Sequence, residues 1–320
     1  MATRFELVMH GENPVALRAA GEEAFAEIER LESQLSLYRS SSEIAHLNAR
    51  AAFCPVQVEP RLFQLLIHAR QLCIETDGAF DITIAPLMRC WGFIGGNGRL
   101  PDEVALEAAR GCVGMHLVEL DGAAFTVRFA KPGVMLDLGS IGKGYALERA
   151  MEILTDAGVT SALLHGGTST VCAMGSPPDK TSWRVAIPHS HRSMGKIRGL
   201  EESTGKSAPD EKPLAVVELR DESLSVSAVW GKAFADGRKV HGHVIDPRTG
   251  NPTQEAVAAA VVVRSATESD ALSTALLTMG PPGLSKISGN RAGTKALVVS
   301  RAGEKNDFRI VSVGMDILED

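Results

Sequence analysis

Apolar residues recur at helical spacing, three or four positions apart, in several segments of the chain. The clearest segment follows Pro14, because proline suits the first turn of a helix and apolar residues then repeat as far as Leu35. Ser40 and Glu43 have the S-x-x-E spacing of a capping box, which predicts that a second helix starts there. The pattern predicts three more helices, over residues 60–76, from the glycine turn at 139–144 to residue 157, and over residues 267–279.

Shorter apolar segments with the character of β-strands alternate with these helices. Residues 115–120 and 125–129 are separated by Asp121-Gly122, a typical hairpin turn. The other predicted strands are residues 5–9, 134–138, 162–165, 183–187, 214–219, 224–226, 243–245, 256–263, 296–299 and 308–313. Because most strands follow one another without regular βαβ alternation, we expect an α+β fold with a mostly antiparallel sheet and packed helices.

Composition and charge exclude several classes of protein. The 320 residues are 44% hydrophobic, which is typical of a globular protein with a sizeable core. The net charge of −6 provides no overall positive field for nucleic acid or an anionic membrane. No segment has the ~18 to 20 apolar residues of a membrane helix, and residues 1–13 lack the apolar centre of a signal peptide. We therefore expect a cytoplasmic protein without membrane insertion.

The five cysteines are scattered and form no C-x-x-C pair, so we expect reduced, mostly buried thiols and neither disulfides nor a structural zinc site. Residues 190–212 are polar and aperiodic, and longer than most connections in compact domains. They are either a lid or a mobile surface insertion, and their composition favours the insertion.

Several familiar catalytic motifs are absent from the sequence. The run GSIGKG at 139–144 lacks the spacing and the final Ser or Thr of a P-loop, and Leu147 stands where a dinucleotide-binding fingerprint needs its third glycine. His165-Gly166-Gly167 is similar to an esterase oxyanion loop, but the chain has no G-x-S-x-G nucleophile elbow.

Three segments combine glycine, charge and rigid turns. Residues 136–146 place Lys143 at the start of a helix, where backbone amides and a cation suit a phosphate-bearing ligand. Residues 241–252 carry two histidines beside a Pro/Gly turn. In the third segment, Asp270 and Thr274 lie four residues apart, so both project from one helix face, where carboxylate and hydroxyl can meet one hard cation.

These segments, together with two earlier ones, form an ordered set of motifs. They are YxxxSEIxxLN, GAFDxTxxPLxxxWGF, LDLGxIxKGYA, HxIDPRTGxP and DALxTAL. The matching residues are Tyr38, Ser42 to Ile44, Leu47 and Asn48; Gly78 to Asp81, Thr83, Pro86, Leu87 and Trp91 to Phe93; Leu136 to Gly139, Ile141 and Lys143 to Ala146; His243 to Pro252, with Val244 and Asn251 at the variable positions; and Asp270 to Leu276, with Ser273 at the variable position. Together they resemble the FAD:protein FMN transferases, also called ApbE-type flavin transferases, over most of the chain.

The chain departs from the family pattern at three places. The family often starts with Met-Gly-Thr, and the chain shows Met9-His10-Gly11. Thr168 follows Gly166-Gly167, where an acidic or amide residue is usual, and residues 227–230 replace Ser-Gly-Asp-Tyr. Many family members are exported lipoproteins, whereas this chain has no lipid-attachment cysteine near its start.

The resemblance implies a single T-fold-like flavin transferase domain over residues 1–320. It implies Mg²⁺-dependent transfer of FMN from FAD to a threonine hydroxyl of an acceptor flavoprotein, with release of AMP. The implied Mg²⁺ ligands are Asp270, Thr274 and the backbone carbonyl of Ser140. The implied FAD contacts are Met9, Tyr38, Ala79, Phe80, Asp81, Asp137, Lys143 and Ile245.

Chemistry adds roles to some of these residues. His243 is the candidate general base for the acceptor hydroxyl, since imidazole titrates near neutrality, whereas His241 is expected to be incidental. Residues 80–93 are expected to supply apolar walls for the flavin, although Trp91 is more easily explained as a core residue than as a stacking partner. Two alternatives stay open, an FAD pyrophosphatase that yields FMN and AMP, and a non-enzymatic FAD-binding protein.

Overall fold

The computed structural model describes residues 3–188, 213–229, 233–236, 239–254, 256–302 and 308–317. Its centre is an antiparallel seven-stranded sheet, in which every pair of neighbouring strands is antiparallel. In spatial order the strands are β1 (Phe5–Met9), β5 (Ala162–Gly166), β6 (Thr170–Met174), β9 (Ser223–Ala228), β12 (Ala256–Val263), β13 (Lys295–Arg301) and β14 (Phe308–Val313). The predicted α+β fold with an antiparallel sheet is confirmed.

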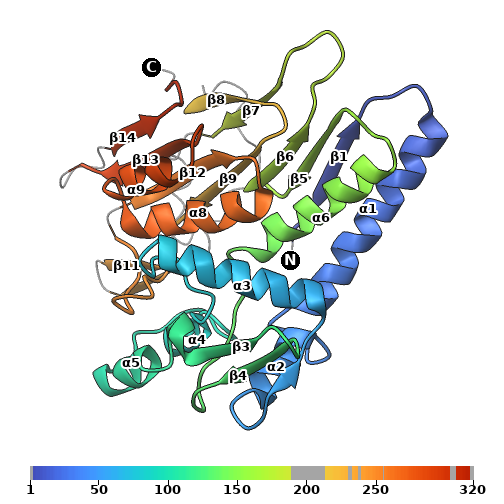
Figure 1. Cartoon of the computed structure of the whole chain (residues 1–320). Coiled ribbons are helices and arrows are strands. Elements are labelled where there is room, and N and C mark those ends of the chain that lie inside the picture. Colours follow the sequence, from blue (N-terminus) through green and yellow to red (C-terminus); the bar gives the residue numbers. More distant parts are fainter. Residues whose placement is uncertain are drawn as a thin grey trace.

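Three helices lie side by side over one face of this sheet (Figure 1): α1 (Pro14–Leu35), α6 (Gly142–Asp156) and α8 (Ala266–Met279). The Asn13 side chain caps α1 by accepting hydrogen bonds from the first turn, and Ser265 caps α8 through the Glu268 amide. Helix α6 has no side-chain cap from its own N-cap residue. Its first amides therefore need partners from elsewhere in the fold.

A smaller layer lies below these helices in Figure 1. The helix α3 (Pro60–Glu75) separates it from the large sheet. The layer contains α2 (Glu43–Arg50), α4 (Ala85–Cys90), α5 (Glu103–Arg110), the 3₁₀ turn η1 (Met115–Leu117) and the sheet β2 (Val56–Gln57), β4 (Thr126–Phe129) and β3 (Val118–Asp121). Beyond these elements, α9 (Gly283–Asn290) follows α8. Two further antiparallel strand pairs are β7 (Trp183–Ile187) with β8 (Ala215–Leu219) and β10 (Ala233–Asp236) with β11 (Lys239–Gly242).

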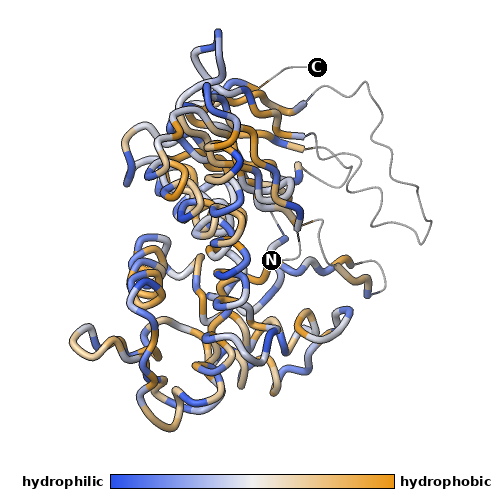
Figure 2. The backbone as a smooth tube through the Cα atoms, turned by 90° about the vertical axis from the view of Figure 1, so that its right-hand side faces the viewer, coloured by the Kyte–Doolittle hydropathy of each residue, from blue (hydrophilic) through white to orange (hydrophobic). Residues whose placement is uncertain are grey.

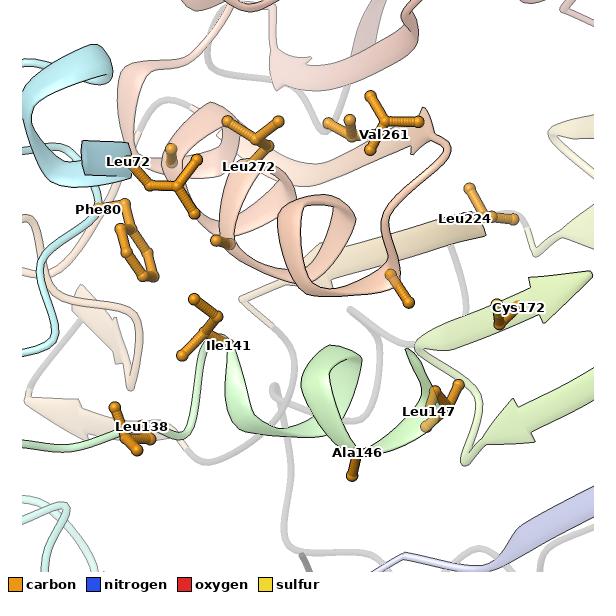
Figure 3. Close-up of a cluster of buried hydrophobic side chains, with 14 of the residues drawn as sticks. Leu72, Phe80, Leu138, Ile141, Ala146, Leu147, Cys172, Leu224, Val261 and Leu272 are labelled. Atoms are coloured by element: carbon orange, nitrogen blue, oxygen red, sulfur yellow. The ribbon is translucent and has the colours of Figure 1, made fainter. Parts of the chain in front are cut away.

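The hydrophobic core joins the large sheet to the helices. All eight residues of β12 are buried, so both faces of the sheet are covered at its centre. Hydrophobic residues gather along the sheet strands in Figure 2. Figure 3 shows Leu72, Phe80, Ile141 and Leu272 converging between α3, the loops before α4 and α6, and α8. This packing holds the start of α6 against α8.

Several local predictions were wrong. The second helix is capped by Ser42, whose Oγ accepts from the Ala45 amide, and Ser40 is not its cap. Residues 134–138 do not form a strand, because the Leu136 amide and carbonyl bond to the Asn48 side chain instead of a neighbouring strand. Residues 243–245 contain only an isolated bridge between Ile245 and Pro252.

The sequence pattern also missed β2, β6, β10, β11, α4, α5 and α9, which are short or lack a clear apolar period. The predicted insertion at residues 190–212 lies outside the described residues. In the part of the chain that the structure describes, no helix combines the length and the apolar character needed to cross a membrane.

Candidate active site

The Asp270 carboxylate lies at the point where α8 crosses the start of α6. Its side chain is 5% exposed, and its Oδ2 accepts a hydrogen bond of 2.9 Å from the Gly144 amide. Gly144 is the third residue of α6, so Asp270 supplies a partner to one of the helix's unpaired first amides. The Lys143 Nζ lies 3.2 Å from Asp270 Oδ1. An anion and a cation, both partly desolvated, therefore meet at a helix N-terminus.

Hydroxyl groups of the large sheet complete the surroundings of Asp270. Thr170 and Ser225 are paired across β6 and β9, so their side chains lie on the same face of the sheet. Their hydroxyls lie 3.4 and 3.3 Å from Asp270 Oδ1. Two residues further along β9, the Ser227 hydroxyl lies 3.1 Å from the Thr274 hydroxyl. The structure thus brings Lys143, Asp270 and Thr274 together, as expected.

Sequence reasoning missed the hydroxyls of Thr170 and Ser225. The signal for Ser225 was present, because Ser223, Ser225 and Ser227 alternate with apolar residues and so face one side of a strand. Nothing in the sequence indicated that this side meets α8.

The loop before α6 contains Asp137 and Ser140. The Asp137 carboxylate accepts from the Gly139 amide at 2.8 Å, and its own amide donates to the Ile82 carbonyl at 2.7 Å. Burial raises the pKa of Asp137, and the Gly139 hydrogen bond opposes this shift. Partial burial and the Asp137 carboxylate raise the pKa of Tyr38, although its side chain is still 69% exposed. Asp137 and Ser140 thus lie in the loop that leads to Lys143 at the start of α6, and Tyr38 lies close enough to Asp137 to be affected by its charge.

Residues 79–81 are joined to this loop through the bond between Ile82 and Asp137. Ala79 and Phe80 are each 1% exposed, and the Phe80 ring packs in the core (Figure 3). The Asp81 carboxylate is bonded to Thr83 and to the Met115 amide. The prediction that residues 80–93 supply flat walls for a flavin is therefore wrong for Phe80, since its ring is already enclosed.

Met9 is not brought to this cluster. It lies at the far end of β1, and its side chain packs against Gly21 of α1. The opposite end of β1 approaches Lys143, because Phe5 and the Lys143 side chain both lie within 3.3 Å of where a Cβ on Gly166 would be.

His243 and Ile245 belong to the segment after β11. Gly242 lies against Val229, since a Cβ on Gly242 would be 3.2 Å from the Val229 carbonyl oxygen. Val229 follows Ser227 by two residues, so His243 comes to the same end of β9 as Thr274. His243 is half-buried, and its ring is 6.5 Å from that of Phe93. Ile245 is 4% exposed in a small cluster with Leu87 and Trp91.

A cavity of about 440 Å³ is lined in part by Asp77, Gly78 and Asp81. Of the predicted site residues, only Asp81 lines it. Its other polar lining comes from Arg70, Asp77, His116 and Arg248, and the Arg248 guanidinium is held by two hydrogen bonds to the Asp246 carboxylate.

The oxygen atoms around Asp270 suit a hard cation that takes its remaining ligands from the substrate and from water. Among the described residues, no group of three or more His, Cys, Asp and Glu is placed to hold a metal. The cluster offers one carboxylate and several hydroxyls, all oxygen donors of the kind that Mg²⁺ prefers. Mg²⁺ commonly binds one or two carboxylates and completes its octahedron with phosphate oxygens and water. The residues present therefore fit such an ion.

Comparison with known proteins shows the family of this chain. The ApbE family model matches residues 1–298. The chain belongs to the ApbE family. It is 31% identical to the FAD:protein FMN transferase of Treponema pallidum over 85% of this chain and 75% of the relative. It is 27% identical to the Salmonella typhimurium enzyme of the same name, over 84% of this chain and 73% of that one.

Solved structures of other ApbE proteins have the same fold. The apo form of the Pseudomonas stutzeri flavinyl transferase ApbE superposes with a TM-score of 0.79 and 31% identity, covering 96% of this chain and 90% of the other. The ApbE protein of Thermotoga maritima superposes with a TM-score of 0.78 and 25% identity, covering 95% and 91%. The resemblance inferred from the motifs is confirmed.

Proposed function

We propose that this ApbE-family chain transfers FMN from FAD to a threonine hydroxyl of an acceptor flavoprotein and releases AMP. The observation that carries the proposal is the Lys143–Asp270 pair at the N-terminus of α6, in a chain whose relatives are named FAD:protein FMN transferases. Partial positive charge at a helix N-terminus and a lysine stabilise bound phosphate.

FAD is proposed to lie along the loop before α6. Lys143 would meet the diphosphate, while Tyr38 and Asp137 flank the approach. Ala79 and Phe80 would contribute backbone atoms, because their side chains are enclosed. Asp81 and Ile245 remain proposed contacts, whereas the position of Met9 argues against a contact from its side chain.

A magnesium ion is proposed to be held by Asp270, Thr274 and the Ser140 carbonyl. When bound, Mg²⁺ neutralises charge on the diphosphate oxygens and so lowers the barrier to phosphoryl transfer. Asp270 is the one carboxylate of this set, and its contacts with Lys143 and Gly144 fix its orientation.

The chemical step needs a group that accepts one proton. The acceptor threonine oxygen forms a bond to the FMN phosphorus, and the bond from that phosphorus to the bridging oxygen breaks, so AMP leaves with the bridging oxygen. His243 is proposed to take the threonine proton. What supports this role is that His243 follows Gly242, which packs against Val229 two residues beyond Ser227, and that the Ser227 hydroxyl contacts Thr274.

The test is incubation of the protein with FAD, Mg²⁺ and a purified flavoprotein whose FMN is attached to a threonine, supplied without flavin. We expect AMP in solution and flavin fluorescence that stays with the denatured acceptor. The matched control is the same acceptor with valine at the target threonine. AMP without an acceptor would indicate a pyrophosphatase, and flavin binding without AMP would indicate a binding protein; either result overturns the proposal.

His243→Ala should slow transfer by ~10² to 10⁴ while FAD affinity changes little, because a general base acts on the hydroxyl and not on the bound flavin. Single-turnover transfer and flavin titration measure the two quantities separately. A parallel collapse of affinity would show that His243 binds FAD or supports the fold.

A further inference from the structure

Aromatic rings connect the short helix α4 to the hairpin β10–β11. We call Trp91, Phe93, Phe234 and His241 the aromatic cluster. Ring centroids are 5.4 Å apart for Trp91 and His241, 5.1 Å for Phe234 and His241, and 5.9 Å for Phe93 and Phe234. The Phe93 ring also meets His243, edge-on at 72° and 6.5 Å. The aromatic cluster therefore packs against one side of the His243 imidazole through Phe93.

Trp91 makes a second connection to the same segment. Its indole Nε1 donates a hydrogen bond of 2.7 Å to the Gly250 carbonyl oxygen, and its side chain is almost completely buried. The Gly250 amide donates to the Asp246 carbonyl at 2.8 Å, and the Thr253 amide donates to the Val244 carbonyl at 2.9 Å. The Trp91 indole thus fixes Gly250, at one end of the turn formed by residues 243–253, and His243 lies at the other end of this turn.

Close packing leaves this turn little freedom to move. Gly250 has a φ of +76°, and a Cβ there would lie 2.8 Å from Arg110 and 3.3 Å from Leu87. Gly98 has a φ of +91°, and any side chain there would collide with the Phe234 ring. The loop that follows α4 therefore closes over the cluster.

We propose that Trp91 is a positioning residue for His243: its hydrogen bond to Gly250 and its place in the aromatic cluster hold the imidazole in line with the acceptor hydroxyl. The proposal rests on the proposed function. A general base must lie within hydrogen-bond reach of its proton, and a displacement of about 1 Å in a positioned group can cost on the order of 10² in rate. Trp91 would act through geometry alone, without touching FAD or the acceptor.

The test variant is Trp91→Phe, which keeps an aromatic ring and removes the Nε1 donor. Trp183→Phe is a matched control, because Trp183 of β7 is 7% exposed, donates from Nε1 to the Met174 carbonyl of β6 at 3.2 Å and stacks on His10, which follows β1. We expect Trp91→Phe to lower kcat for FMN transfer about tenfold or more, with less than about a threefold change in the Kd for FAD. Trp183→Phe should leave both quantities unchanged. Thermal melting shows whether each variant is folded.

A double-mutant cycle with His243→Ala separates positioning from a structural role. If Trp91 acts through His243, adding Trp91→Phe to His243→Ala should cause no further loss of rate. The same tenfold loss in both backgrounds would overturn the proposal. If Trp91→Phe proves unfolded, Phe93→Leu replaces it in the cycle, since this change loosens the ring against His243 and leaves the Gly250 bond in place.

The outcomes also distinguish this proposal from the proposed function. A wild-type protein that transfers no FMN overturns both. Transfer that is lost in His243→Ala but normal in Trp91→Phe and Phe93→Leu overturns the positioning role alone.

Discussion

At the scale of single residues, one carboxylate organises the site. Asp270 accepts from Lys143 and the Gly144 amide and lies within hydrogen-bond distance of the Thr170 and Ser225 hydroxyls. These partners come from α6, β6 and β9, so the position of Asp270 depends on three elements at once. Its negative charge is balanced by Lys143, whose Nζ lies 3.2 Å from Asp270 Oδ1.

Asp270→Asn should reduce Mg²⁺-dependent AMP release by about 10², because the amide keeps the shape of the side chain and removes the charge that would hold the cation. AMP release across a Mg²⁺ titration measures the effect. Ser269→Ala is the control, since its hydroxyl bonds to the Val261 carbonyl away from Asp270. Release at the wild-type rate at low Mg²⁺ would remove Asp270 from the metal site.

A second residue-scale prediction concerns the buried imidazole of His241. Its exposed fraction is 8%, and neither ring nitrogen has a hydrogen-bond partner among the described residues. Burying an unpaired polar group costs about 1–3 kcal/mol, so His241→Phe should increase the free energy of unfolding by up to this amount. Urea denaturation measures it.

His10→Phe is the control for His241→Phe. His10 also stacks on an indole, that of Trp183, but it is half-buried and should show no such gain. A less stable His241→Phe variant would mean that the imidazole nitrogens have partners in solution.

At the scale of elements, the site depends on how closely α6 and α8 cross. Gly144 allows this approach, because a Cβ there would collide with the Ala266 carbonyl and lie 2.8 Å from the Asp270 Cβ. The short distance is what lets the Asp270 carboxylate reach an amide of the other helix.

Gly144→Ala should therefore push the helices apart and destabilise the protein by ~1–3 kcal/mol or more, with loss of AMP release. Gly289→Ala in α9 is the matched control, because no atom lies within 4 Å of its added Cβ and alanine favours helix by up to about 1 kcal/mol. The measurement is chemical denaturation of both variants. Equal stability of the two would show that the crossing tolerates a methyl group.

At the scale of the whole molecule, charged side chains fasten α3 to α8. Glu268 accepts from Arg291 at 2.8 Å and lies 3.3 Å from His68 of α3. Arg291 also donates to Glu75 at 2.6 Å. The hydrogen bond from His68, followed by those from Arg291, lowers the pKa of Glu268 to about 2, against the opposing effect of burial.

The sign of the pH dependence follows from this lowered pKa. Ionised Glu268 stabilises the fold above its unfolded pKa of about 4.5, and this contribution is lost as the pH falls towards about 2. The difference in unfolding free energy between wild type and Glu268→Gln should therefore be largest near pH 6 and shrink below pH 4. Urea titrations at several pH values measure it.

Glu107→Gln provides the comparison, since Glu107 pairs with Arg110 on the surface and its side chain is 75% exposed. That variant should differ little from wild type at any pH, because exposed ion pairs contribute little. A Glu268→Gln difference that does not change with pH would contradict the assigned origin of the pKa.

The sequence by itself determined the helices α1, α3 and α8, the antiparallel arrangement of strands and the family. Helices and strands can be predicted locally, because the spacing of apolar residues has a period of about 3.6 in a helix and 2 in a strand. The family can be inferred because its motifs occur in a fixed order along the chain. The sequence also indicated Lys143, Asp270 and Thr274 as candidate site residues. A lysine at the start of a helix suits a phosphate, and a carboxylate and a hydroxyl four residues apart on a helix can meet one cation.

Only the tertiary structure decided which partners these residues meet. Lys143 and Asp270 are 127 residues apart, and Trp91 and Gly250 are 159 apart, so no local pattern encodes their contacts. Met9 illustrates the same point, since the pairing of β1 with β5 puts Phe5, and not Met9, at the end of the strand that lies near Lys143. The physical reason is that burial and hydrogen bonding are properties of packed surfaces, which form only when distant elements pair in a particular register.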